Sequence, residues 1–139
     1  MNDKVRILVV DDEDVVRRCY VRTLASERCV VETASNGFEA LQRMQDQRFD
    51  VVLLDLRMPG MGGMNVLKAI KARWPDCEVI IITGHPMLET AKESVTLGAH
   101  DYLAKPVGPD EVISATNKAL LNKRWALRRE PSPAQALMH

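Results

Sequence analysis

The sequence predicts an α/β domain with a doubly wound parallel sheet. Two observations lead to this fold class: short apolar runs alternate five times with segments of helical periodicity, and several of the runs are uninterrupted, as in strands buried on both faces. Such alternation indicates parallel strands joined by helical crossovers. Because these crossovers are right-handed, the flavodoxin-like (βα)5 arrangement with strand order 2-1-3-4-5 is the expected topology.

The predicted strands are short and aliphatic. The third is the clearest, because Val51 to Leu54 form an unbroken apolar run before Asp55. The second is more polar than the others. In chain order, the predicted strands are residues 5–10, 29–34, 49–54, 78–83 and 99–104.

The predicted helices follow these strands. Asn36 and Glu39 have the spacing of a capping box at the start of the second helix, and Gly98 is expected to end the fourth. The helices are expected over 14–26, from 36 onward, over 64–74, 87–97 and 110–129. Their apolar stripes are Val15, Val16, Cys19, Tyr20 and Leu24 in the first, Phe38, Leu41 and Met44 in the second, Leu88, Ala91 and Val95 in the fourth, and Val112, Ile113, Thr116, Ala119 and Leu120 in the fifth.

Composition and charge exclude several classes of function. The chain has 139 residues and equal numbers of basic and acidic residues, 19 of each, so no overall basic field attracts nucleic acid or an anionic membrane. No apolar run approaches the roughly 20 residues of a membrane span. The three cysteines lack metal-type spacing and are expected to be buried small hydrophobes in a reducing compartment, which favours a cytoplasmic protein.

The length suits one domain, assigned to residues 1–124. Residues 125–139 are expected to form an extension of the last helix and a flexible tail, or the start of a linker. The tail contains Pro131 and Pro133, which do not favour a continued helix.

Chemically distinctive residues follow four of the predicted strands. They are Asp11 and Asp12 after the first strand, Asp55 after the third, Thr83 at the end of the fourth and Lys105 after the fifth. The carboxyl ends of parallel strands meet at one rim of the sheet, so these side chains are expected to lie together. Three carboxylates at close range need a cation, and hard oxygen ligands favour Mg²⁺ (or Mn²⁺). Taken alone, Asp11 and Asp12 would be read as helix-capping acids.

A lysine and a hydroxyl beside such a metal site suit a ligand with additional anionic oxygens. Mg²⁺, Lys105 and Thr83 could each hold one oxygen of a transferring phosphoryl group. Asp55 is central in the predicted cluster and is therefore the expected nucleophile, forming an aspartyl phosphate.

The sequence resembles the receiver domain of bacterial two-component response regulators over residues 4 to 122. Four motifs carry the resemblance, in order and with family-like intervals of 28 residues from Asp55 to Thr83 and 22 from Thr83 to Lys105. They are VVDDE at 9–13, VLLDLRMP at 52–59, IITG at 81–84 and DYLAKP at 101–106.

The resemblance implies a phosphorylation-activated signalling switch whose donor is a phosphohistidine on a sensor histidine kinase or phosphotransfer protein. It implies that Asp55 is the phosphoacceptor, that Asp12 is a direct metal ligand with Asp11 acting through water, and that the backbone carbonyl of Arg57 completes the metal site. Such a domain is a regulator rather than an enzyme, although it promotes its own phosphotransfer and self-dephosphorylation.

Further expectations concern the partners of the phosphate oxygens, the backbone after the fifth strand and the access of water to Asp55. The resemblance makes Thr83 and Lys105 partners of the phosphate oxygens and Tyr102 the switch aromatic that moves inward with Thr83. A cis peptide is expected at Lys105–Pro106, because an X-Pro bond is the one at which cis is cheap and the chain must turn back here. Arg57 and His85 flank the predicted acceptor, and Arg57 is expected to shield it from water.

Other functions stay possible on the same fold. A flavodoxin-like FMN-binding domain would need a phosphate loop rich in Ser, Thr or Gly after the first strand, where this chain has acids, and a non-phosphorylated docking module would lack an acceptor. The sequence leaves open whether the chain is a stand-alone receiver or part of a longer regulator.

The partners expected from sequence include a second copy of the chain. We expect a homodimer through the fourth helix, fifth strand and fifth helix, because an apolar stripe of Leu121, Trp125 and Leu127 extends past the core with Lys123 and Arg124 interleaved. Direct binding of nucleic acid by residues 1–122 is not expected.

Overall fold

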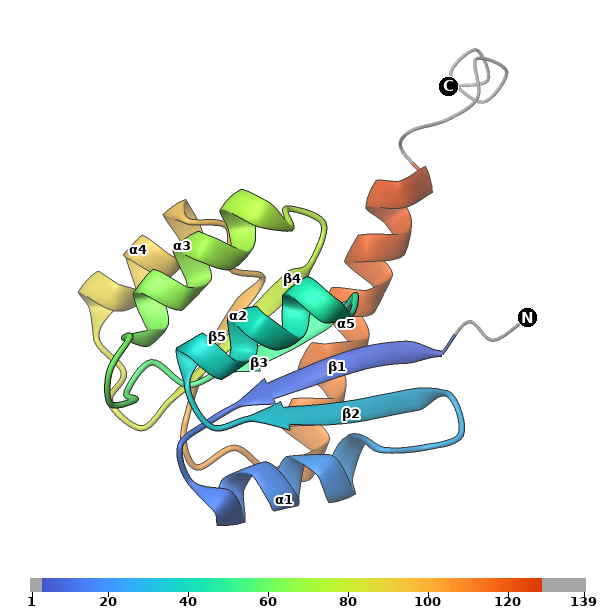
Figure 1. The fold of residues 1–139 in the computed structure, drawn as a ribbon, viewed down its shortest axis with the longest axis horizontal. Coiled ribbons are helices and arrows are strands. Elements are labelled where there is room, and N and C mark those ends of the chain that lie inside the picture. Colours follow the sequence, from blue (N-terminus) through green and yellow to red (C-terminus); the bar gives the residue numbers. More distant parts are fainter. Residues whose placement is uncertain (1–3, 129–139) are drawn as a thin grey trace.

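Five parallel strands form the centre of the molecule, in the spatial order β2-β1-β3-β4-β5 (Figure 1). The computed structural model describes residues 4–128, with side chains through residue 123. The strands are β1 (Val5–Val10), β2 (Cys29–Ala34), β3 (Val51–Leu54), β4 (Glu78–Thr83) and β5 (Asp101–Ala104). The predicted flavodoxin-like strand order is therefore confirmed.

Four helices connect the strands, a fifth follows the last strand, and together they cover both faces of the sheet (Figure 1). They are α1 (Asp14–Leu24), α2 (Gly37–Asp46), α3 (Gly63–Arg73), α4 (Leu88–Thr96) and α5 (Pro109–Arg128). The predicted cap of α2 is present, since the Asn36 side chain accepts a hydrogen bond from the Glu39 backbone N–H at 2.9 Å. The Glu39 carboxylate, however, accepts from the N–H of Ser35, the residue before the cap, and not from Asn36 as in a capping box. Gly98 follows α4 with φ of +97°, as expected of a helix-ending glycine.

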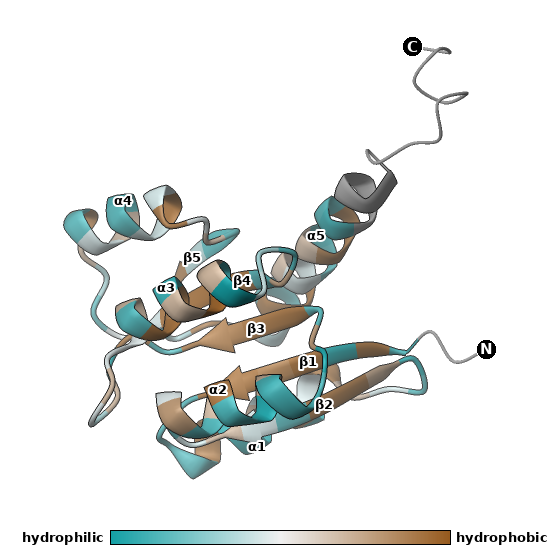
Figure 2. Ribbon diagram, turned by 45° about the horizontal axis from the view of Figure 1, so that its top comes forward, coloured by the Kyte–Doolittle hydropathy of each residue, from teal (hydrophilic) through white to brown (hydrophobic). Residues whose placement is uncertain are grey.

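Alternate residues of the strands build two apolar layers. Leu8, Val52 and Ile81 face α2 and α3, whereas Ile7, Leu53 and Ile80 face α1 and α5. The central strand β3 and most of β1 are accordingly coloured as hydrophobic in Figure 2, whereas the edge strand β5 is largely hydrophilic. Aliphatic residues buried on both faces explain why β3 and β4 read as continuous apolar runs.

Several residues predicted to face the sheet are exposed. Val15 is 78% exposed and Phe38 is 64% exposed, because both lie in the first turn of a helix, where the chain has just left the strand edge. Ile113 is also exposed, on the flank of α5 next to the inward-facing Val112. Helical spacing predicted too wide an inward stripe in each case.

Two of the three residues in the predicted apolar stripe of α4 are exposed, and the third, Ala91, is half-buried. Leu88 and Val95 are 71% and 70% exposed, whereas Ser94 is fully buried and its hydroxyl donates to the Ala91 carbonyl at 2.8 Å.

The expectation for the cysteines was correct for Cys77, which is buried, and wrong for Cys19, which is exposed on α1.

The last helix extends past the strands that it covers. α5 has 20 residues, about 30 Å of helix, and its end projects beyond the amino-terminal ends of β3 and β4 (Figure 1). The side chains of the predicted stripe residues Trp125 and Leu127 lie outside the described part of the structure. The predicted tail at 129–139 lies outside the described residues. Within residues 4–128, no helix combines the length and apolar character needed to cross a membrane.

Candidate functional site

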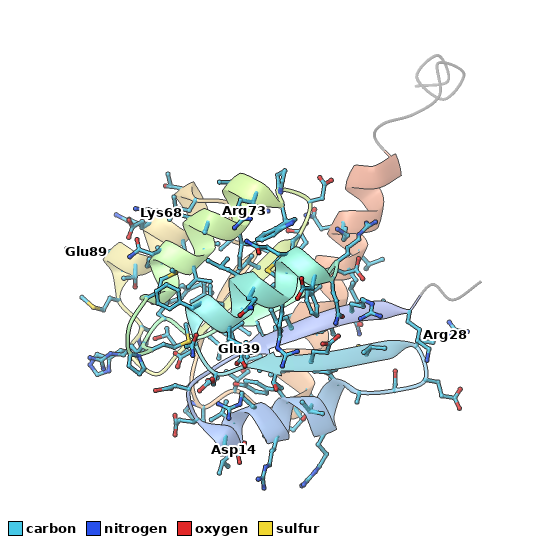
Figure 3. All side chains as sticks on the ribbon, viewed as in Figure 1. Asp14, Arg28, Glu39, Lys68, Arg73 and Glu89 are labelled. Carbon is cyan, nitrogen blue, oxygen red and sulfur yellow. The ribbon has the colours of Figure 1, made fainter. Side chains whose placement is uncertain are left out.

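The carboxyl ends of β1 and β3 bring three aspartates together. Val10 pairs with Leu54 across the two strands, so Asp11 and Asp55 leave neighbouring strands at the same level, and the Asp55 N–H donates to the Val10 carbonyl at 3.0 Å. Carboxylate oxygens of Asp11, Asp12 and Asp55, which we call the acidic cluster, all lie within 4.8 Å of one another. The charged residues Asp14 and Glu39, labelled in Figure 3, mark the same edge of the sheet.

Close packing of the backbone holds Asp55 in place. A Cβ atom on Gly63 would lie 2.5 Å from the Asp55 carbonyl oxygen and 2.5 Å from the Leu56 Cα. Only glycine therefore lets the start of α3 approach the end of β3 this closely. The Asp55 carboxylate itself accepts a hydrogen bond from the Arg57 N–H at 3.2 Å, which places the Arg57 backbone beside the cluster.

Lys105 reaches the acidic cluster from the carboxyl end of the edge strand β5. Thr83 pairs with Ala104, and the Lys105 N–H donates to the Thr83 carbonyl at 2.8 Å, so the lysine follows directly beyond the end of β4. The Lys105–Pro106 peptide bond is cis. The Lys105 Nζ lies 2.9 Å from Asp11 Oδ2 and 3.6 Å from Asp55 Oδ2.

The charges of the cluster act on one another at short range. Burial raises the pKa of Asp55, the Arg57 N–H lowers it, and nearby Asp11 raises it again, so the net pKa is above its ordinary value. Burial lowers the pKa of Lys105, but its hydrogen bond and charge interaction with Asp11, aided by Asp55, give a net raised pKa. The lysine is thus held as a cation between two acids.

Thr83 and Tyr102 are both near the ends of β4 and β5 but have separate partners. Thr83 is fully buried, and its hydroxyl accepts a hydrogen bond from the His85 N–H at 3.0 Å. Tyr102 is half-buried, and its hydroxyl accepts from the Met87 N–H at 3.2 Å and lies 2.7 Å from the Thr90 hydroxyl. Tyr102 therefore joins β5 to the start of α4.

Sequence reasoning missed two α1 residues beside the cluster. The Arg17 guanidinium donates to the Asp11 carbonyl at 2.7 Å. Tyr20 was assigned only to the apolar stripe; it is buried, and burial raises the pKa of its hydroxyl, with Lys105 lowering it and Asp11 raising it. The signal for both was their position one and two turns after the acids, on the helix that leaves β1.

The acidic cluster suits a small divalent cation. An octahedral Mg²⁺ binds oxygens at about 2.1 Å, so its ligands lie about 3 to 4.2 Å apart. The carboxylate oxygens here need only a small contraction from their present spacing. Asp11 already binds Lys105 and the Glu13 N–H, whereas Asp12 is exposed at the same cluster. The candidate donors are all oxygen atoms, which favours Mg²⁺ or Mn²⁺ over softer metals.

Known proteins match nearly the whole described part of the chain. Residues 7–117 match the response regulator receiver domain family. The alginate biosynthesis transcriptional regulatory protein AlgB of Pseudomonas syringae pv. tomato is 38% identical over 125 residues, 90% of this chain and 28% of the relative. The DNA-binding transcriptional regulator NtrC of Escherichia coli K12 is 40% identical over 114 residues, 82% of this chain and 24% of the relative. This chain thus spans about a quarter of the length of these relatives.

The fold also has solved counterparts of similar size. A response regulator receiver domain protein from Clostridium thermocellum superposes with a TM-score of 0.82 at 35% identity, covering 88% of this chain and 98% of the other.

Proposed function

Because this chain belongs to the response regulator receiver domain family, we propose that it is a phosphorylation-activated switch in which Asp55 accepts the phosphoryl group. The donor in this proposal is a phosphohistidine on a sensor histidine kinase or phosphotransfer protein. One observation carries the assignment: Asp55 is buried within an acidic cluster that also receives the Lys105 ammonium. The FMN-binding and docking-module alternatives have no support from the relatives.

The transfer can be written from the side chains present. A carboxylate oxygen of Asp55 forms a bond to phosphorus while the bond from phosphorus to the histidine nitrogen breaks. The electron pair stays on the imidazole, which takes a proton from water. A divalent cation held by Asp11, Asp12, Asp55 and the Arg57 carbonyl would supply neutralising charge for the phosphoryl oxygens. Lys105 is close enough to Asp55 to pair with one of those oxygens.

Thr83 and Tyr102 are the proposed switch. The Thr83 hydroxyl accepts from His85 but has a proton to donate, so a phosphoryl oxygen on Asp55 could draw it away from its present partner. Tyr102 would then exchange its contacts with Met87 and Thr90 for an inward position. This exchange would alter the start of α4, the helix with two exposed aliphatic residues.

Replacement of Arg57 is expected to shorten the life of the aspartyl phosphate. Arg57 is exposed next to Asp55, where its guanidinium can cover the approach of water, whereas an asparagine amide can orient water. We expect Arg57→Asn to hydrolyse several-fold to tenfold faster, about 1.4 kcal/mol or less in barrier. Loss of phosphate is followed by intact-mass spectrometry after removal of the donor. Arg48→Asn, at an exposed position near the amino-terminal end of β3, serves as the control. Equal rates of phosphate loss in both variants and the unmodified protein would contradict a shielding role for Arg57.

We also propose a phosphorylation-dependent homodimer through α4, β5 and α5. Leu88 and Val95 on α4 and Leu121 on α5 are exposed aliphatic side chains on these elements. An isologous two-fold contact would bury these side chains in both subunits. Val95→Ser is expected to weaken dimerisation at least tenfold in sedimentation equilibrium, while the same change at Val15, a similarly exposed valine on α1, leaves it unchanged. Monomers at all concentrations, with and without phosphate, would contradict the dimer.

The length of the relatives suggests a setting for the switch. We propose that the domain is the regulatory part of a longer transcriptional regulator, in which α5 leads toward the output segment. The coding sequence downstream of residue 139 tests this directly, because an effector domain encoded there would be expected.

A further inference from the structure

Lys123 is a buried lysine far from the acidic cluster. It lies on α5 and is 6% exposed, although the sequence pattern placed it among basic residues interleaved with a stripe that extends past the core. Val112, Thr116 and Ala119 precede it on the buried face of the same helix, so Lys123 occupies the next core-facing position. An apolar residue would be ordinary at such a position, whereas a buried ammonium needs partners.

The partners of Lys123 lie where β3 and β4 begin. Its Nζ donates to the Asp76 carbonyl at 2.7 Å and lies 4.0 Å from Asp50 Oδ1. Asp50 is itself fixed, because its other carboxylate oxygen accepts from the Arg6 N–H at 2.9 Å. Lys123 therefore connects α5 to the strand layer through the chain segments that precede β3 and β4.

The preceding residue makes a second connection to the same edge. The Asn122 side-chain amide donates to Glu78 Oε2 at 2.8 Å, and Glu78 is the first residue of β4. The Glu78 N–H in turn donates to the Asp50 carbonyl at 3.0 Å. Two consecutive residues of α5 thus bind a single small region of backbone and carboxylates.

We propose that Asn122 and Lys123 form a clamp that fixes the direction in which α5 leaves the domain. The helix continues five residues beyond Lys123, about 7.5 Å, past the amino-terminal ends of β3 and β4 (Figure 1). At its other end, α5 begins at Pro109, a few residues after Lys105, whose ammonium binds Asp11 of the acidic cluster. The helix therefore connects the candidate site to the opposite edge of the domain, and the clamp makes it move with the sheet instead of fraying.

The clamp adds positioning residues to the proposed function, and it rests on that function only for the claim that α5 carries the signal. Lys123 and Asn122 touch neither the acidic cluster nor Lys105. Their loss should consequently leave phosphoryl uptake at Asp55 unchanged while the far end of α5 loses its fixed direction.

Hydrogen–deuterium exchange of the full 139-residue chain tests the clamp. We expect Lys123→Met to raise the exchange rate of the amides in the second half of α5 at least tenfold and to leave those of β3 and β4 within twofold. Lys118→Met, at an exposed position on the same helix, is the matched control and should match the unmodified chain. Labelling with acetyl phosphate and Mg²⁺ is measured in parallel and should be equal in all three proteins.

A milder pair keeps the test decisive if Lys123→Met does not fold. Asn122→Ala removes one exposed hydrogen bond and should raise exchange in the same part of α5, whereas Asn117→Ala should not. Unchanged exchange in Asn122→Ala, or an equal rise across strands and helix in Lys123→Met, would overturn the clamp and leave Lys123 as a general stabiliser. Absence of labelling in the unmodified chain would contradict the proposed phosphoacceptor without affecting the exchange result.

Discussion

Asp55→Asn is expected to take up no phosphoryl group and to unfold at an equal or higher temperature than the unmodified protein. The amide lacks the anionic oxygen that would attack phosphorus. Burial, the largest influence, leaves the pKa of Asp55 above its ordinary value in the folded state. A carboxyl group with a raised folded-state pKa costs stability as pH rises through the interval between its unfolded and folded pKa values, and the cost is fully present above it. The uncharged amide removes that cost at neutral pH.

Intact-mass spectrometry after incubation with Mg²⁺ and acetyl phosphate measures uptake, and a thermal melt of each protein measures stability. Asp46→Asn, at an exposed position at the end of α2, should keep both the labelling and the melting temperature of the unmodified chain. Stoichiometric labelling of Asp55→Asn would disprove the acceptor assignment. A large drop in its melting temperature would show that the carboxylate is stabilising, contrary to the sign of its pKa shift.

The fold could be predicted from sequence because the strands are buried on both faces. Continuous aliphatic runs such as Val51–Leu54 have few alternatives once five of them alternate with helices. The placement of Asp11 and Asp55 followed from the same argument, since parallel strands end at one edge. The candidate site could therefore be predicted without knowledge of any tertiary contact.

Orientation of side chains on the helices was harder to predict. Spacing cannot tell which flank of a helix overhangs the sheet, so Val15 and Phe38 were placed inward although they lie in first turns beyond the strand edge. The burial of Lys123 could not be predicted from the sequence either. A lysine on a long helix normally reaches solvent, and here the carbonyl of Asp76 and the carboxylate of Asp50 make its burial favourable. Such partners come from distant segments, which local patterns do not report.

Removal of divalent metal is expected to abolish phosphoryl uptake, and the two amino-terminal aspartates should differ in their contribution. Asp11 is buried and already binds Lys105 at 2.9 Å and the Glu13 N–H at 2.9 Å, which suits an outer position that orients water. Asp12 is exposed beside the same oxygens and is free to bind a cation directly. We therefore expect Asp11→Ala to weaken Mg²⁺ binding by about 10–100-fold, as loss of an outer-shell partner does, and Asp12→Ala to weaken it further.

Calorimetric titration with Mg²⁺ separates metal affinity from phosphoryl uptake, so each variant is measured both ways. In chelator, no protein should be labelled, because Asp11, Asp12 and Asp55 then repel both one another and the anionic donor. Glu13→Ala retains a backbone N–H for Asp11 and removes only an exposed carboxylate, which makes it the control for a general loss of negative charge. If Asp12→Ala binds Mg²⁺ as tightly as Glu13→Ala, the cation is held by Asp11 and Asp55, and the direct role moves from the exposed to the buried acid.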